Sequence, residues 1–300
     1  MRNPLGPFRF CVLIAATMIV SASVDAGTCC VWRITNVDHP FYLVGTIHAL
    51  SSTDWPLPKP YMEALNNSQR LVFEIRYDPK SDFPDKFALA ACYKKGDDIR
   101  RHVKPQTWAF LGKQYGYSHF FEFPWTIGKH HMAGIEELRP WAVAWMIWGV
   151  RGWSDVYGAH GVDNKLDFHA RRMGKETAGL ETSDEHVAVL TNLTDTESEL
   201  MLLDAIVRGD RRRDDYNQYR AAWRKGDIAK MWELDQRERK LNPGAEAKLL
   251  DLRNVKWIPK IKAEIATGKP TTILVGAAHY PGYNGLLKLL EKQGYKLEQL

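Results

Sequence analysis

The chain has 300 residues, of which 45% are hydrophobic and 26% charged, and its formal net charge is +5. This balance is that of a globular protein with a substantial core, and it excludes a disordered or fibrous chain. The only basic run, 211–213, is flanked by Asp210, Asp214 and Asp215. Such a run is typical of a solvated helix face, so nucleic-acid binding is not indicated.

The amino terminus has the parts of a secretory signal peptide. Arg2 and Arg9 precede or border the apolar run 10–20, and small residues lead to Ala26. The run is shorter than the ~18–20 apolar residues of a membrane-spanning helix. We therefore expect residues 1–26 to be a cleaved signal peptide and residues 27–300 to be a single domain with no membrane span. The mature protein is then periplasmic or secreted.

Three cysteines remain after cleavage of the signal peptide, namely Cys29, Cys30 and Cys92. A disulfide from Cys92 to either of the two adjacent cysteines is compatible with export, and the sequence does not choose between them. The three are not at metal-ligand spacing, so a zinc knuckle is not predicted.

Hydrophobic periodicity predicts the secondary structure in chain order. Strands are expected over residues 30–36, 41–44, 70–75, 176–181, 271–275 and 295–300. Helices are expected over 60–66, from 140 onward, over 163–173, in several segments of 195–240, over 245–258 and from 286 to 293. This alternation predicts an α/β protein, with a β-sheet core flanked by helices and a mainly helical middle region.

Two helices of the middle region carry residues with a local role. Asp163 is expected to cap the amino end of the helix over 163–173. Trp141, Trp145 and Trp148 fall at i, i+4 and i+7, and we expect this stripe to belong to the core. His186 has no special setting in the sequence and is expected at the surface or in a loop.

A duplicated motif is the main functional signal. YLVGTIH at 42–48 and ILVGAAH at 273–279 share an aliphatic residue followed by Leu-Val-Gly-x-x-His. Each places a histidine, His48 or His279, just after the carboxyl end of a buried strand, which is the edge where α/β sheets bind ligands. If the two strands are neighbours related by pseudo-symmetry, the two imidazoles converge.

Each half also offers a carboxylate at a strand end, Glu74 in LVFEI and Glu181 in GLET. Two histidines and two glutamates suit a divalent cation, or a cation with one carboxylate left as a general base. Mixed nitrogen and oxygen ligands are compatible with Mn²⁺, Co²⁺, Fe²⁺ or Zn²⁺ and do not select among them.

The chain resembles the TraB/GumN family, which includes the Tiki metalloproteases and the bacterial pheromone-shutdown proteins, and it is most similar to the GumN-like branch. The matching stretches run through nearly the whole mature chain in family order. They are YLVGTIHALSSTDWPLP, LVFEI, the RPW at 139–141, GVDNKLDFHARRMGKETAGLET, WRKGD, LLDLRNVKWIPKI and VGAAHYPGYNGLLKLLEKQGYKLEQL.

The resemblance implies a fold of two pseudo-repeats related to erythromycin-esterase-like and ChaN-like proteins. It also implies that the paired Gly-x-x-His motifs form the site and that Glu74 is the family's glutamate. Arg253 and Asn254 match the family's Arg-Asn pair, whose implied role is to orient a substrate carbonyl or stabilise an oxyanion. The alternative is that Arg253 and Asn254 lie on the surface of a helix and have no role in a site. Arg76 stands where the family often has an acid, so no ligand role is carried over there.

Taken together, these features predict an exported metal-dependent hydrolase. The resemblance to the Tiki metalloproteases implies that it is a peptidase. His48, Glu74 and His279 are the expected metal ligands, Glu181 is a further ligand or base, and the substrate is a peptide or small molecule. The alternatives are a non-catalytic peptide or small-ligand binding protein and an esterase, which the fold alone does not separate. The oligomeric state is left open.

Overall fold

The structure is a computed structural model that describes residues 28–76, 81–115, 126–127, 130–131, 134–150, 158–209 and 212–300. The expected signal peptide lies outside these ranges. None of the helices within them is long and apolar enough to cross a membrane.

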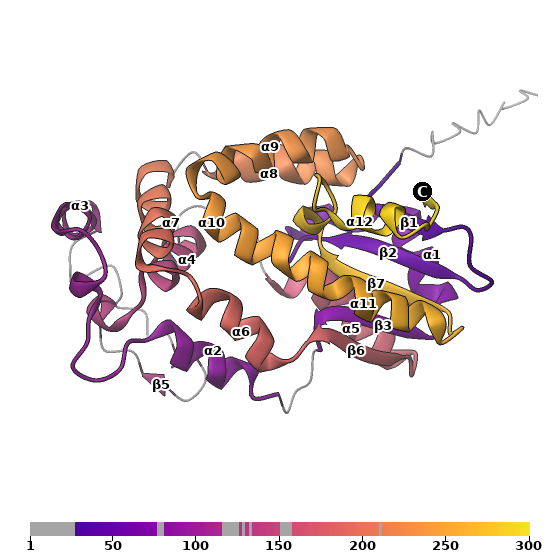
Figure 1. Ribbon diagram of the computed structural model, residues 1–300, viewed down its shortest axis with the longest axis horizontal. Coiled ribbons are helices and arrows are strands. Elements are labelled where there is room, and N and C mark those ends of the chain that lie inside the picture. The colour runs from indigo at the N-terminus through magenta and orange to yellow at the C-terminus, as the bar shows by residue number, and fades with distance from the viewer. Residues whose placement is uncertain are drawn as a thin grey trace, which may run out of the picture.

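A mixed six-stranded sheet forms one half of the molecule (Figure 1). Its strands in spatial order are β6 (Glu176–Glu181), β3 (Arg70–Ile75), β7 (Thr271–Gly276), β2 (Phe41–Thr46), β1 (Val31–Ile34) and β8 (Leu297–Gln299). The first four are parallel to one another, whereas β1 is antiparallel to both of its neighbours. The predicted strands are therefore present, and their parallel core confirms the α/β class.

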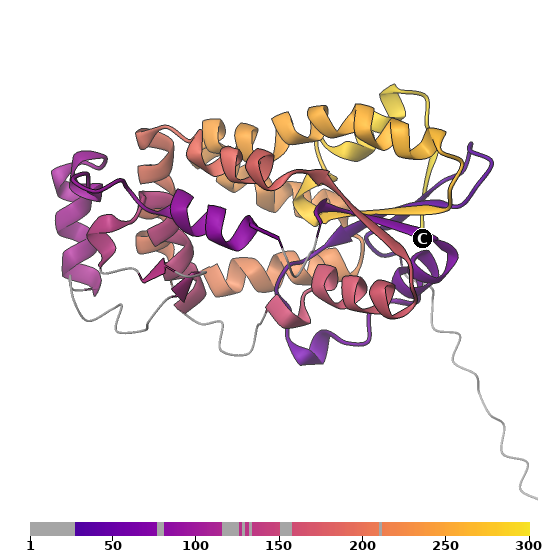
Figure 2. The same cartoon turned by 90° about the horizontal axis from the view of Figure 1, so that it is seen from below.

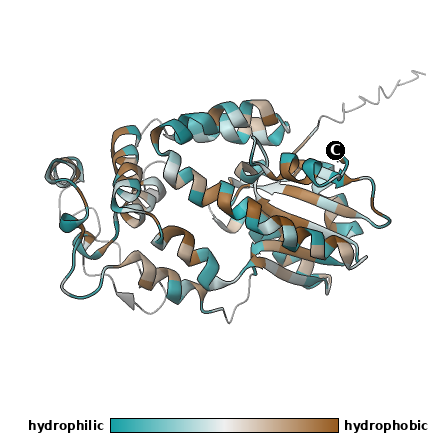
Figure 3. Cartoon of the chain, in the orientation of Figure 1, coloured by the Kyte–Doolittle hydropathy of each residue, from teal (hydrophilic) through white to brown (hydrophobic). Residues whose placement is uncertain are grey.

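Helices cover both faces of the sheet. They are α1 (Lys59–Asn67), α5 (Val162–Arg172), α11 (Leu252–Ala266) and α12 (Leu286–Lys292). Figure 2 shows α11 on one face and α5 on the other. Both faces of β2 and β7 are consequently buried, which explains why these strands are continuous apolar runs rather than alternating ones. The central strands carry mainly hydrophobic residues (Figure 3).

The other half of the molecule is helical (Figure 1), as predicted for the middle region. Its helices are α2 (Phe83–Ala91), α3 (Pro105–Tyr115), α4 (Pro140–Val150), α6 (Ser183–Thr191), α7 (Asp195–Arg208), α8 (Arg212–Arg224), α9 (Ile228–Leu241) and α10 (Pro243–Glu246). A π-helical turn, Ala247–Asp251, joins α10 to α11, and the short strands β4 (Thr126–Ile127) and β5 (His130–His131) form a separate pair. A second hydrophobic cluster lies between α2, α3, α4 and α7.

Three local predictions are corrected by the structure. Gly161, not Asp163, occupies the amino-terminal cap of α5, and Asp163 lies inside its first turn. Trp141 is buried as expected, but the side chain of Trp145 is 39% exposed, because the helix face that carries the tryptophan stripe borders a cavity. The disulfide considered between Cys92 and Cys29 or Cys30 is not formed in the part of the chain that the structure describes.

Candidate functional site

A cavity of about 610 Å³ lies between the carboxyl ends of β2, β3 and β7 and the helical half. Its walls come from the strand ends on one side and from α6, α8 and α9 on the other. This is the edge where parallel α/β sheets bind ligands, and the volume is within the range of small-molecule sites. The cavity is therefore the candidate site of the protein.

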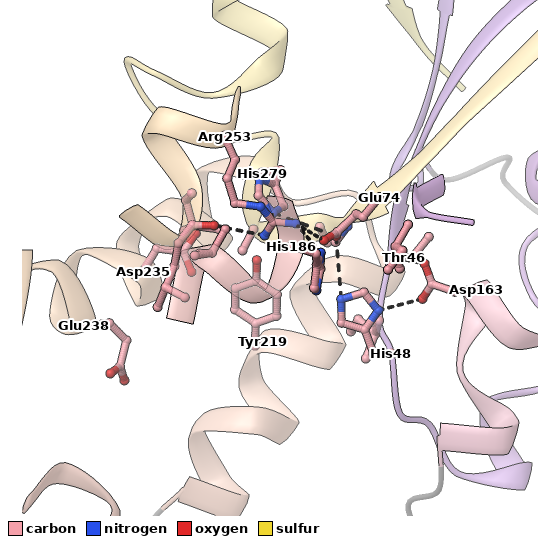
Figure 4. Close-up of a pocket in the computed structure, with 18 of the residues that line it drawn as sticks. Thr46, His48, Glu74, Asp163, His186, Tyr219, Asp235, Glu238, Arg253 and His279 are labelled. Atoms are coloured by element: carbon pink, nitrogen blue, oxygen red, sulfur yellow. Dashed lines mark hydrogen bonds and ion pairs between the residues drawn. The ribbon is translucent and has the colours of Figure 1, made fainter. Parts of the chain in front are cut away.

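Three of the predicted site residues meet at this edge (Figure 4). His48 follows β2, Glu74 lies near the end of β3, and His279 follows β7. The Oε1 atom of Glu74 is 3.7 Å from the Nε2 atom of His48 and 3.8 Å from that of His279. Because β2 and β7 are parallel neighbours, with Thr46 opposite Gly276, the duplicated motifs lie side by side.

Gly276 leaves the space that these three side chains face. Its backbone N–H donates to Glu74 Oε1 over 2.7 Å. A Cβ atom at this position would lie 3.2 Å from that oxygen, 3.3 Å from His48 Nε2 and 3.6 Å from His279 Cδ2. Glycine thus lets the backbone approach the site closely, and the point that its missing side chain would fill is bordered by all three groups.

His48 is oriented by Asp163. Its Nδ1 atom is 2.8 Å from one carboxylate oxygen of Asp163, and the hydroxyl of Thr46 donates to the other oxygen over 2.8 Å. The Asp163 charge raises the pKa of His48 above its ordinary value. A Cβ on Gly161 would overlap the carbonyl oxygen of His48, so glycine allows α5 to begin against this loop. Asp163 is available to His48 because it does not cap the helix.

His279 is oriented by Asn254. Its Nδ1 atom is 2.7 Å from the amide oxygen of Asn254, whose NH₂ group donates to the carbonyls of His279 and Asn284. These carbonyls accept from the NH₂ end, so the amide oxygen faces the ring and the proton of His279 is on Nδ1. Burial lowers the pKa of His279 to about 3, so the imidazole is neutral. Its Nε2 atom faces the site with a lone pair.

Arg253 lies between the two glutamates. Its NH2 atom donates to Glu74 over 2.6 Å and to Glu181 over 2.9 Å, and its Nε atom donates to Glu181 over 2.8 Å. Its NH1 atom is also 3.3 Å from His279 Nε2. The Arg-Asn pair is therefore buried at the site and does not lie on the surface of α11.

Both glutamates are held as carboxylates. Burial raises the pKa of Glu181, but hydrogen bonds from His186 and Arg253 outweigh it and lower the pKa to about 2. Burial also raises the pKa of Glu74, but the nearby charge of Arg253 outweighs this effect, and the pKa of Glu74 is well below its ordinary value. Two ionised carboxylates therefore share one buried guanidinium.

Two residues at the site were not predicted from the sequence. Asp163 was expected to cap a helix, and His186 was expected at the surface. His186 instead lines the cavity, with its Nδ1 atom 2.8 Å from Glu181. The only sequence signal for His186 is its position five residues after Glu181, in the first turns of a helix that begins with a capping box at Thr182. Such a signal does not specify function.

Within the described ranges, no group of three or more His, Cys, Asp or Glu side chains is arranged so that it could hold a metal ion. At the candidate site, the NH2 atom of Arg253 contacts Glu74 and its NH1 atom contacts His279. Two imidazoles and a carboxylate therefore face one space, and the buried guanidinium of Arg253 lies beside them.

The family model described as the TraB/PrgY/gumN family matches residues 30–299. The matched range includes every residue of the candidate site. No curated protein and no solved structure matches the chain.

Proposed function

Because the chain belongs to the TraB/PrgY/gumN family, we propose that it is an exported, metal-dependent hydrolase of the GumN-like branch that cleaves a peptide in the cavity. The choice of a peptide rests on the likeness to the Tiki metalloproteases. Export to the periplasm or beyond rests on the signal-peptide pattern of residues 1–26. The observation that supports the chemistry is the convergence of His48, Glu74 and His279 on the space beside Gly276.

The donor set suits a divalent cation in kind, although the side chains are not at metal-binding distances as they stand. Imidazole nitrogen and carboxylate oxygen are ordinary ligands of Mn²⁺, Fe²⁺, Co²⁺ and Zn²⁺. Two ligands of one tetrahedral ion lie about 3.4 Å apart, whereas Glu74 Oε1 lies 3.7 Å from His48 Nε2 and 3.8 Å from His279 Nε2, so metal binding would have to draw these atoms closer together. The Nδ1 contacts of both histidines leave their Nε2 atoms as the ligand atoms, an arrangement that is usual for metal-binding histidines.

The local charge also favours a divalent cation. Three carboxylates, those of Glu74, Glu181 and Asp163, surround the site, and Arg253 provides one positive charge. Asp163 raises the pKa of His48, so metal binding would release the proton from His48, because a metal ligand must be a neutral imidazole. Three negative charges less one then leave two. A cation of charge +2 balances this excess.

Each residue then has a distinct part in hydrolysis. His48, Glu74 and His279 would hold the metal, which supplies a bound water of lowered pKa and a Lewis acid for the carbonyl. The NH1 atom of Arg253 donates to the carbonyl of Leu249 over 3.1 Å and lies 3.3 Å from His279 Nε2. With His279 bound to the metal, the second N–H of NH1 would be left to polarise the scissile carbonyl. Both ends of the Asn254 amide already form hydrogen bonds, so Asn254 is not available to contact an oxyanion directly. We propose instead that its role is to orient the ring of His279.

The test is the metal content of the mature protein purified without added metal, measured by elemental mass spectrometry. We expect near-stoichiometric Mn, Fe, Co or Zn, lost in the His48→Ala, His279→Ala double variant and kept in His169→Ala, whose side chain is outside the cavity. The metal-loaded protein should cleave fluorescein-labelled casein, and the double variant should not. Failure to bind Mn²⁺, Co²⁺ or Zn²⁺ would contradict the proposal and favour a binding protein. Cleavage of p-nitrophenyl acetate but not of casein would indicate an esterase.

Asp163 provides a finer test of the same site. Asp163→Asn keeps the size of the side chain but removes the charge that orients His48, and we expect metal affinity to fall about 10–100-fold, as for other groups that orient a metal-binding histidine. Titration calorimetry with Zn²⁺ measures the change. Asp184→Asn is the control, because that side chain is 78% exposed and pairs with Lys86. Equal affinities for Asp163→Asn and wild type would contradict the assignment of His48 as a ligand.

A further inference from the structure

His186 is a third histidine on the wall of the cavity. It lies in the first turns of α6, and its ring is in edge-to-face contact with Phe83, with 5.4 Å between ring centroids. Figure 4 shows it beside the group formed by Glu74, Arg253 and His279. Its ring is therefore held in place at the site by two different elements.

Glu181 has no free position for a proton from water. A carboxylate has about four lone-pair positions, and Glu181 accepts from four donor atoms. They are Nε and NH2 of Arg253 (2.8 and 2.9 Å), Nε1 of Trp257 (3.0 Å) and Nδ1 of His186 (2.8 Å). The side chain is also only 6% exposed. A base that takes a proton from water must therefore be a different group.

The contact with Glu181 also determines which nitrogen of His186 carries the proton. Glu181 is an acceptor only and lies 2.8 Å from Nδ1, closer than the NH2 atom of Arg253 at 3.3 Å, so the shorter contact places a hydrogen on Nδ1. In the neutral ring, Nε2 then has a lone pair. The Nε2 atoms of His48 and His279 both face Glu74. In the part of the chain that the structure describes, the Nε2 atom of His186 has no hydrogen-bond partner.

We propose that His186 is the proton acceptor and donor of the site, and that Glu181 is the positioning residue that holds its ring. The inference rests on the proposed hydrolase function and reassigns the base within it. Oriented imidazoles of this kind, with a carboxylate on Nδ1, act as general bases in unrelated hydrolases. Glu181 thus serves Arg253 and His186 at once.

The step balances as follows. The water oxygen forms a bond to the carbonyl carbon, the π electron pair of the carbonyl moves to its oxygen beside Arg253, and a water proton moves to Nε2 of His186. The C–N bond then breaks as the carbonyl re-forms, and its electron pair leaves with the nitrogen. That nitrogen takes the proton from His186, which returns to its starting state. The products are a carboxylic acid and an amine.

The test compares His186→Asn with wild type in the metal-loaded protein, using fluorescein-labelled casein. Asparagine keeps a donor for Glu181 but has no imidazole nitrogen, so kcat should fall about 10²–10⁴-fold, the usual contribution of general acid–base catalysis. KM and metal content should be unchanged. Added imidazole should restore part of kcat in His186→Ala, which a purely structural role does not predict. His169→Asn is the matched control and should behave as wild type.

Two results would overturn the inference alone. One is an active wild type whose kcat is kept in His186→Asn. The other is a proton on Nε2 rather than Nδ1, read from the ¹⁵N–¹H correlation pattern of the side chain after assignment with His186→Asn. A wild type that binds Mn²⁺, Co²⁺ or Zn²⁺ but cleaves nothing would instead overturn the proposed hydrolase, and with it the reaction that His186 serves.

Discussion

Replacing Arg253 by methionine is expected to lower the free energy of unfolding at pH 7 by about 3–5 kcal/mol, the usual effect of removing one partner of a buried ion pair. Arg253 is 8% exposed and is the cation that the carboxylates of Glu74 and Glu181 share. Methionine fills part of the volume but leaves two buried carboxylates without a cation. The loss therefore comes from unpaired charge rather than from a cavity.

The same variant should reverse the pH dependence of stability. In the wild type, the pKa of both glutamates is below the ordinary 4.5, so their contribution is fully present above that pH. It is lost as pH falls from about 4.5 toward the folded-state value, which is about 2 for Glu181. In Arg253→Met, burial without a cation raises the pKa values of both glutamates, so protonation should restore stability as pH falls below neutrality.

Urea unfolding followed by tryptophan fluorescence between pH 3 and about 8 measures both effects. Arg237→Met is the matched control, because that arginine is 49% exposed and pairs with Asp215 and Glu233 at the surface, where an ion pair contributes about 0–1 kcal/mol. A variant at Arg253 that is as stable as the control, with the wild-type pH dependence, would show that the glutamates do not depend on this guanidinium.

The strands and the duplicated motif were predictable because both depend on short-range patterns. The strands predicted over 70–75 and 176–181 have the bounds found in β3 and β6, since Arg70 and Glu176 begin runs that are bounded by turn residues. The position of His48 and His279 follows from Gly-x-x-His at the end of two buried runs. Their meeting required the further step that β2 and β7 pair in parallel.

The rest of the site depends on contacts between distant segments. Asp163 has the local features of a helix cap, yet it contacts Thr46 and His48 more than 100 positions earlier. Trp145 shares a helical stripe with Trp141, but the stripe does not show that a cavity borders one of the two. His186 is recognised only through Glu181 and the fold that brings both to Arg253.

Substitution by alanine should have different effects at the two duplicated glycines, Gly45 and Gly276, although their motifs are alike. Gly276→Ala is expected to lower kcat/KM about 10²-fold, the effect of small displacements of reacting groups, and to reduce bound metal. The new Cβ would lie 3.2 Å from Glu74 Oε1 and 3.3 Å from His48 Nε2. The backbone at Gly276, with φ −49° and ψ 136°, suits alanine, so stability should change little.

Gly45→Ala places its Cβ against the core instead, 3.1 Å from Cys30 Cβ and 3.4 Å from Ala277. Overpacking of this kind costs about 1–3 kcal/mol of stability, while the groups at the site keep their positions. Casein cleavage, metal content and urea unfolding of the two variants therefore separate the two effects. Full activity and full metal content in Gly276→Ala would mean that the space beside this glycine is not the reactive centre, because the new Cβ occupies the point that Glu74 and His48 both border.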